Sequence, residues 1–257
     1  MRKKTVDAIA VKSFALLVLL GIVALGTAYL RTSNLLITPA MAQGATTLYP
    51  KMAPIEQYLM DRTAEIALAR TAAPESISGD AKVLALGRHG FEIAVEGKNG
   101  FVCIVERSWT SANDADFWNP KVRTPICYNA AAARSLLPRN IKRTDLILAG
   151  HTQAQTDGAI FAAVDKKELP AMEPGAMCYM MSKQGYGGDT APHWPAHVMF
   201  FYSGIDPASW GANLPGSPLM AVSDDREKLT EFAVGVGRWS DGTEDRSAEG
   251  ANGHTGH

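Results

Sequence analysis

The sequence lacks the short motifs by which many catalytic and nucleotide-binding sites are recognised. It contains no G-x-S-x-G, no H-E-x-x-H and no G-x-G-x-x-G, which are the patterns of serine hydrolases, zinc peptidases and dinucleotide-binding folds. No C-x-x-C pair occurs among its three cysteines, which argues against a zinc ribbon or a thioredoxin-like redox centre. We therefore predict no cofactor, and any enzymatic site would have to be assembled from separate segments.

The chain also lacks a cluster of basic residues beyond residue 42. Residues 1–42 carry five basic residues and one acid, which leaves 20 basic and 25 acidic residues and a formal charge of about −5 in the rest. Binding to phosphate backbones needs concentrated positive charge. The composition therefore argues against nucleic acid as a partner.

The N-terminal segment has the order of features found in a secretory signal. Arg2, Lys3 and Lys4 precede an apolar run at 13–30, and Ala40 and Ala42 form a small-residue cleavage site. We expect residues 1–42 to be a signal peptide and the protein to be periplasmic or secreted. Because the run has about 18 residues, an uncleaved anchor with the protein facing outward is the alternative, and it would be the sole membrane contact.

The three cysteines, Cys103, Cys127 and Cys178, all follow this leader. An oxidising compartment permits a disulfide, and an odd number leaves one thiol over. We predict a bridge between Cys103 and Cys127, with three buried free thiols as the alternative.

The remaining pattern predicts an α+β fold, in which a mostly antiparallel sheet of about six to seven strands packs with two to three helices. Helices are expected at 54–73, at 130–137 after the cap Asn129, and from the capping-box pair Thr152 and Gln155 onward. Strands are expected at 81–86, 91–96, 101–107, 177–181, 198–202, 219–222 and 230–239. Asn99-Gly100 predicts a tight hairpin between the second and third of these strands. We expect one domain at 43–240 and a disordered tail at 241–257.

Polar and aromatic residues follow the third predicted strand, where the end of a sheet can present them to a pocket. The candidate ligand-binding residues are Glu106, Arg107, Trp109, Trp118 and Arg123. An arginine beside an aromatic wall can bind a carboxylate or a phosphate. Charge at the end of a buried strand equally fits an ion pair that closes the core.

Two segments contain residues that can bind metal ions. Asp189, His193 and His197 could supply one oxygen and two nitrogens to a divalent metal ion, but Pro192 and Pro195 argue against a helix that would bring the histidines together. The run at 177–186 holds methionines and Cys178, which are soft ligands for Cu(I) or haem iron. Their alternation along a strand favours core packing for this second segment.

Four strings resemble a set found in uncharacterised exported bacterial proteins: GFVCIVERSW at 100–109, FWNPKVRTPICYNAAAARSLLP at 117–138, PGAMCYMMSKQGY at 174–186 and WGANLPGSP at 210–218. The resemblance implies export and a shared fold, and it assigns no role to any residue.

We expect an exported, non-catalytic domain that binds a small molecule or an envelope component. The alternative is a metal-dependent or other hydrolase with a site assembled from Glu106, Arg107, Asp189, His193 and His197.

Overall fold

The computed structural model describes residues 48–110 and 116–246, all within one compact unit, Thr46–His257. The predicted leader and most of the predicted tail lie outside the described residues. In chain order the elements are η1 Ile55–Gln57, α1 Arg62–Arg70, α2 Glu75–Ser78, β1 Lys82–Gly87, β2 Gly90–Val95, β3 Val102–Glu106, η2 Ser108–Thr110, β4 Thr124–Tyr128, α3 Ala130–Ser135, α4 Leu137–Leu148, α5 Gln153–Asp165, β5 Met177–Met180, β6 His197–Tyr202, η3 Pro207–Trp210, β7 Leu219–Asp224 and β8 Leu229–Gly235.

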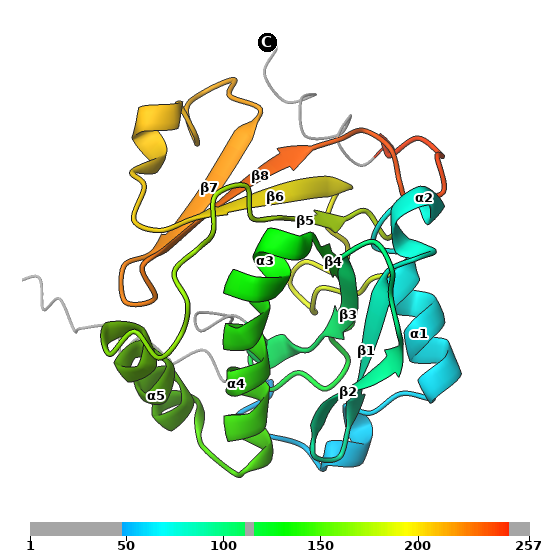
Figure 1. Cartoon of the computed structure of the whole chain (residues 1–257), viewed down its shortest axis with the longest axis vertical. Coiled ribbons are helices and arrows are strands. Elements are labelled where there is room, and N and C mark those ends of the chain that lie inside the picture. The colour runs from blue at the N-terminus through cyan, green and yellow to red at the C-terminus, as the bar shows by residue number, and fades with distance from the viewer. Residues whose placement is uncertain (1–47, 111–115, 247–257) are drawn as a thin grey trace, which may run out of the picture. The chain divides into compact units, whose positions relative to one another are not determined.

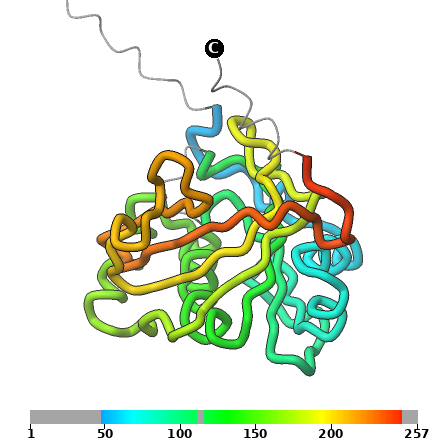
Figure 2. Tube along the Cα trace, turned by 90° about the horizontal axis from the view of Figure 1, so that it is seen from above, coloured from blue at the N-terminus to red at the C-terminus, as the bar shows by residue number. Residues whose placement is uncertain are grey.

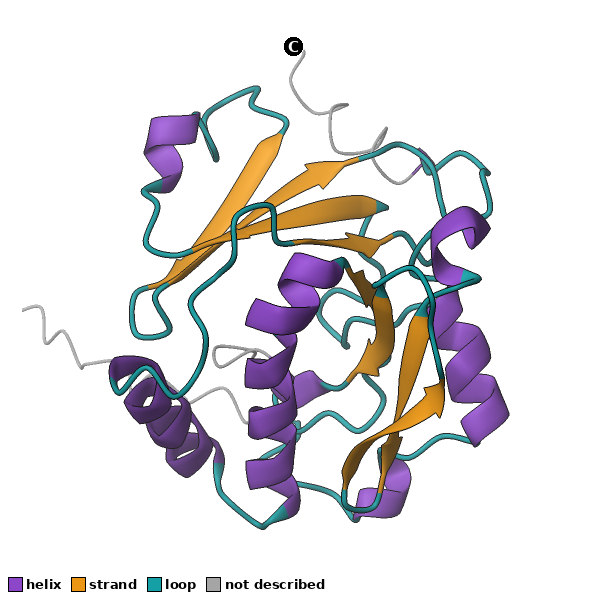
Figure 3. Ribbon diagram, in the orientation of Figure 1, coloured by secondary structure: helices purple, strands orange, loops and turns teal. Residues whose placement is uncertain are grey.

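The strands form one eight-stranded sheet with the order β2-β1-β3-β4-β5-β6-β8-β7. Every neighbouring pair is antiparallel except β1 and β3. The sheet is strongly twisted, so β6, β8 and β7 run across the view at a large angle to β1 and β3 (Figures 1 and 3). The fold is α+β as predicted. The predicted six to seven strands and two to three helices were too few, because the described chain has eight strands and five α-helices.

The additional strand, β4, and one of the two additional helices, α4, each contain a proline. Pro125 pairs with Val105 at a point where β4 has not yet paired with β5, so its missing N–H removes no hydrogen bond to β5. Pro138 was expected to stop a helix, but it lies in the first turn of α4, where a proline needs no N–H partner.

The hairpin predicted at Asn99-Gly100 is absent. Gly100 has the positive φ of 80° that the turn requires, yet β2 pairs with β1 and β3 pairs with the other edge of β1 in parallel. The turn therefore leads the chain past β1. The structure places the hairpin between β1 and β2 instead, where Gly90 has a φ of 129°.

Helices cover both faces of the β1–β4 half of the sheet. Helix α1 packs on β1, β3 and β4, over a core that includes Val83, Cys103 and Val105. Helices α3 and α4 pack on the opposite face, over Leu84, Ile104 and other residues. Figure 2 views the same layers from above. We call the surface of the sheet that faces α3 and α4 the α4 face.

The predicted pair of cysteines lies at disulfide distance. Cys103 of β3 is directly opposite Cys127 of β4, with Cα atoms 4.0 Å apart, and the two form a disulfide in the α1-facing core. Cys178 of β5 is a buried thiol on the α4 face.

Two predicted helix starts are confirmed, and a third is displaced. The Asn129 side chain accepts a hydrogen bond from the Ala132 amide, and the capping box of Thr152 and Gln155 begins α5. In the segment expected to be helical from Pro54, the α-helix begins only after Asp61, whose carboxylate accepts a hydrogen bond from the Ala64 amide.

The ordered chain continues beyond residue 240, where we expected a tail. Asp245 is buried, and its carboxylate accepts a hydrogen bond of 2.6 Å from the Ala196 amide. None of the helices in the described ranges is long and apolar enough to cross a membrane.

Candidate functional site

The two charged residues at the end of β3 point to opposite faces of the sheet. Arg107 lies on the α1 side, fully buried, where it donates hydrogen bonds to Glu65 at 2.9 Å and to the Tyr58 carbonyl at 2.8 Å. Glu106 lies on the α4 face, and its carboxylate accepts a hydrogen bond from Tyr128 and one of 3.0 Å from Asn140. The structure therefore places Arg107 in an ion pair that closes the core, apart from Glu106.

Trp109 and Arg123 also make contacts within the protein. The Trp109 indole is buried. Its ring centroid lies 4.7 Å from that of Tyr58 with the two ring planes tilted by 48°, and the indole donates a hydrogen bond of 3.1 Å to Thr144. The Arg123 guanidinium donates hydrogen bonds to the carbonyls of Gln57, Pro120 and Val122. Arg123 thereby joins the backbone segment that follows Trp118 to the backbone of Gln57.

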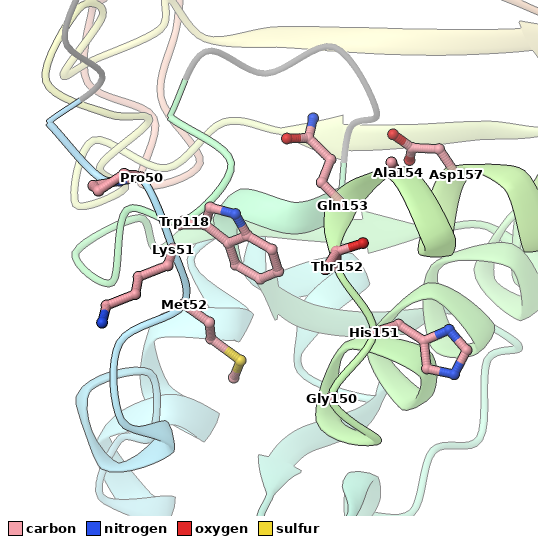
Figure 4. Close-up of a pocket in the computed structure, with 10 residues that line it drawn as sticks. All are labelled: Pro50, Lys51, Met52, Trp118, Gly150, His151, Thr152, Gln153, Ala154 and Asp157. Carbon is pink, nitrogen blue, oxygen red and sulfur yellow. The ribbon is translucent and has the colours of Figure 1, made fainter.

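Trp118 is the candidate that lines a sizeable cavity. The cavity has a volume of about 620 Å³ and is open to solvent. Figure 4 shows the Trp118 indole between Lys51 and Met52 on one side and Thr152 and Gln153 on the other. We call this cavity the Trp118 cleft. Its complete lining is Pro50, Lys51, Met52, Trp118, Gly150, His151, Thr152, Gln153, Ala154 and Asp157.

Tyr58 connects the parts of one wall. Its hydroxyl donates a hydrogen bond of 2.7 Å to the Trp118 carbonyl and accepts one of 3.2 Å from the Ala53 amide. Phe117 contacts the Trp118 ring edge-on at 4.7 Å, and its carbonyl accepts a hydrogen bond from Ser108. Segments more than 60 residues apart in the sequence are thereby fixed side by side.

The opposite wall is the turn between α4 and α5. Gly150 has a φ of 89°, which allows the chain to reverse after α4. The capping box of Thr152 and Gln155 then fixes the first turn of α5. Asp157 forms an ion pair with Arg143 of α4, so this carboxylate is neutralised by the protein.

The charge that remains available in the cleft is positive. The Lys51 ammonium is exposed and forms no ion pair with any residue in the described ranges. The amino-terminal end of α5 adds partial positive charge. In Figure 4 the Lys51 ammonium and the His151 imidazole both point away from the Trp118 ring, so either side chain would have to turn to reach a ligand lying on the indole.

A second polar cluster, which the sequence did not indicate, lies between the sheet and α4. Burial raises the pKa of Glu106 to about 7, and the nearby charge of Glu231 adds to this effect. Burial likewise raises the pKa of Glu231 on β8 to about 7, and repulsion from Glu227 contributes. Raised carboxyl pKa values are common at functional sites and also occur in structural networks. The signal available in the sequence was the position of Glu231 inside an apolar strand.

The predicted metal ligands do not converge. Asp189 accepts hydrogen bonds from Tyr49 and Tyr186 and pairs with Lys121 at 3.4 Å. His193 is exposed, whereas His197 is buried in β6. Within residues 48–110 and 116–246, no group of three or more His, Cys, Asp or Glu side chains is arranged to hold a metal ion.

No family model, curated protein or solved structure matches this chain.

Proposed function

We propose that the protein is an exported domain that binds a small planar molecule carrying a negative charge in the Trp118 cleft. The observation that carries this proposal is the partly exposed Trp118 ring, which lines an open cavity of about 620 Å³ together with Met52 and the exposed Lys51 side chain. Ligand sites in proteins typically have volumes of about 300–1,000 Å³ and combine apolar walls with a few polar groups.

The lining favours a ligand with two different ends. The Trp118 ring and the Met52 thioether offer apolar, polarisable surface for a flat group. Lys51 and the first turn of α5 favour a carboxylate or a similar acid. The acid of the cleft, Asp157, does not compete for Lys51, because Arg143 already neutralises it.

The hydrogen bonds of Tyr58 hold the cleft in shape before a ligand arrives. A preformed site loses less conformational entropy on binding than one that must be ordered by its ligand. This supports binding as the role of the cleft.

Export is supported by the leader-like sequence of residues 1–42 and by the cysteine pair at disulfide distance. The disulfide fits an oxidising compartment such as the periplasm. Recovery of the protein outside the cytoplasm with Gln43 as its first residue would test this part of the proposal.

A hydrolase built from Glu106, Arg107, Asp189, His193 and His197 is the alternative function. Its support is weaker, because Glu106 and Arg107 lie on opposite faces of the sheet. Asp189 has three partners of its own.

The binding proposal is tested by calorimetric titration with 2-naphthoate and with the uncharged 2-naphthalenemethanol. We expect the wild-type protein to bind the naphthoate more tightly. Trp118→Ala should weaken binding of both by at least about tenfold, because aromatic anchors dominate small sites. Lys51→Met should reduce the preference for the anion and leave the part that the first turn of α5 supplies.

Trp194→Ala is the matched control, because Trp194 is exposed and lies outside the cleft. The Trp118→Ala variant keeps the backbone carbonyl that Tyr58 contacts, so its fold should be retained. Unchanged naphthoate affinity in Trp118→Ala would contradict the proposal.

A further inference from the structure

One ring nitrogen of His197 forms no hydrogen bond within the part of the chain that the structure describes. The side chain is only 5% exposed, and its Nδ1 lies 2.6 Å from the Pro195 carbonyl oxygen. A carbonyl can only accept a hydrogen bond, so Nδ1 carries the proton and Nε2 keeps a lone pair. Nε2 forms no hydrogen bond within residues 48–110 and 116–246.

This histidine lines a small cavity together with a thioether. Met180 of β5 is directly opposite His197 in the register of β5 and β6, and both residues border a cavity of about 20 Å³. That volume suits a single ion or water molecule. Trp194 borders the same cavity, with its ring centroid 6.2 Å from that of His197.

A second thioether lies one step along β6. Met199 follows His197 by two residues, so both side chains are on the α4 face. Met180 and Met199 both pack against the same core cluster on that face. The register thus brings one imidazole and two thioethers onto the same face of two neighbouring strands. His197 and Met180 line the cavity, whereas Met199 lies outside its lining.

The ligand types determine which metal ion fits. Thioethers are soft ligands that select Cu(I), whereas calcium and magnesium require oxygen ligands. Structural zinc sites are built from four thiolate or imidazole ligands. The free thiol of the described chain, Cys178 of β5, is buried in the apolar core cluster and does not line the cavity.

We propose that His197 Nε2, Met180 and Met199 form a binding site for Cu(I), with the Trp194 ring beside it. One further feature supports this assignment. The bond from Nδ1 to the Pro195 carbonyl orients the imidazole, as hydrogen bonds to the non-coordinating ring nitrogen do in metal sites.

The site is independent of the Trp118 cleft, with which it shares no lining residue. It contains one of the three residues that we considered for a divalent ion, His197, and neither of the others. Failure of this proposal would leave the proposed function of the cleft intact.

The test is an anaerobic competition between the purified exported protein and the Cu(I) complex of bicinchoninate. We expect the wild-type protein to remove one equivalent of Cu(I). Three substitutions, Met180→Leu, Met199→Leu and His197→Asn, should each weaken Cu(I) affinity at least about tenfold, the usual scale when a metal ligand is disturbed. An Asn amide can still donate to the Pro195 carbonyl, so the last variant should fold.

Controls separate this site from other soft or basic groups. Met220→Leu removes an exposed thioether on β7 and should leave Cu(I) affinity unchanged, as should a His254→Ala/His257→Ala double variant. Retention of wild-type affinity in Met180→Leu, Met199→Leu and His197→Asn would overturn the proposal. Loss of binding in Cys178→Ser but not in Met180→Leu would also overturn it.

Discussion

The hydroxyl of Tyr58 donates a hydrogen bond of 2.7 Å to the carbonyl of Trp118, 60 residues further along the chain. The same hydroxyl accepts a hydrogen bond from the Ala53 amide. One buried phenol thus fixes the aromatic wall of the Trp118 cleft relative to the segment that carries Lys51 and Met52.

Tyr58→Phe should therefore reduce stability and ligand binding together. The partly buried Ala53 amide and Trp118 carbonyl would lose their partner, at a cost of about 1–3 kcal/mol in the free energy of unfolding. Binding of 2-naphthoate should weaken although Trp118 is still present. Urea unfolding and calorimetry measure the two effects. Tyr202→Phe is the matched control, because the Tyr202 hydroxyl forms no hydrogen bond with any residue in the described ranges.

The two buried glutamates beneath α4, Glu106 and Glu231, should make the free energy of unfolding decrease as pH rises. The folded-state pKa values of Glu106 and Glu231 are about 7, above the ordinary value of 4.5. The folded protein therefore binds more protons than the unfolded chain between these values, and the free energy of unfolding falls across that interval. The two carboxyls interact, so they titrate as a pair.

Glu106→Gln should flatten this decrease. The amide oxygen of Gln can accept the hydrogen bonds from Tyr128 and Asn140 without carrying charge. At pH 8 the variant should be more stable than the wild type by up to about 3 kcal/mol, since the pKa of Glu106 is raised from 4.5 to about 7 and each pKa unit corresponds to about 1.4 kcal/mol. Urea unfolding at pH 5, 6, 7 and 8 measures the profile. Glu56→Gln, at an exposed position, should not flatten it, and a wild-type profile that rises from pH 5 to 8 would contradict the prediction.

Local capping signals were predictable from the sequence, whereas strand pairing was not. Asn129 and Thr152 begin helices through bonds to residues three positions away, so the pattern is complete within one turn. The Asn99-Gly100 turn has the expected backbone conformation, but the partner of β2 depends on where β1 lies. That choice depends on burial of apolar surface by distant segments and not on the turn.

The cleft could be predicted only in part for the same reason. Trp118 was a candidate because of its residue type and position, but Lys51 and the first turn of α5 meet it only in the folded chain. Glu231 alternates with Phe232 in β8, and the polar side of such a strand is normally taken to face solvent. In the structure this side faces Arg139 of α4 instead.

The disulfide predicts a defined number of reactive thiols. If Cys103 and Cys127 are bridged as the structure places them, the denatured exported protein should react with iodoacetamide at Cys178 alone. Mass spectrometry before and after reduction counts the modified sites. Reaction at all three cysteines without reduction would contradict the bridge.

Loss of this bridge should destabilise the fold. The bridge spans a sequence separation of 24 residues, and closing a loop of this size stabilises a protein by about 3 kcal/mol. A Cys103→Ala/Cys127→Ala double variant should show this reduction in the free energy of unfolding by urea. Adding a reducing agent to the urea unfolding experiment should lower the stability of the wild type and leave that of the double variant unchanged.

The Asn213 side chain protects the exposed edge of the sheet at β7. Strand β7 is an edge strand, and its residue Ala221 exchanges two hydrogen bonds with the Asn213 side chain, at 2.8 Å and 2.9 Å. The amide thus occupies backbone groups that another strand could otherwise pair with. Asn213 has a φ of 60°, a conformation that glycine also adopts readily.

Asn213→Gly should therefore keep the turn but free the edge of β7, with exposed Met220 and Val222 beside it. We expect this variant to self-associate with increasing concentration, as measured by size-exclusion chromatography with light scattering. The matched control is Asn99→Gly, which also removes an asparagine from a turn. The Asn99 side chain donates a hydrogen bond to the Ile77 carbonyl of α2 and makes no contact with β7 that would protect its edge. Equal association of the two variants would show that protection of the β7 edge is not the cause, because only Asn213 contacts Ala221.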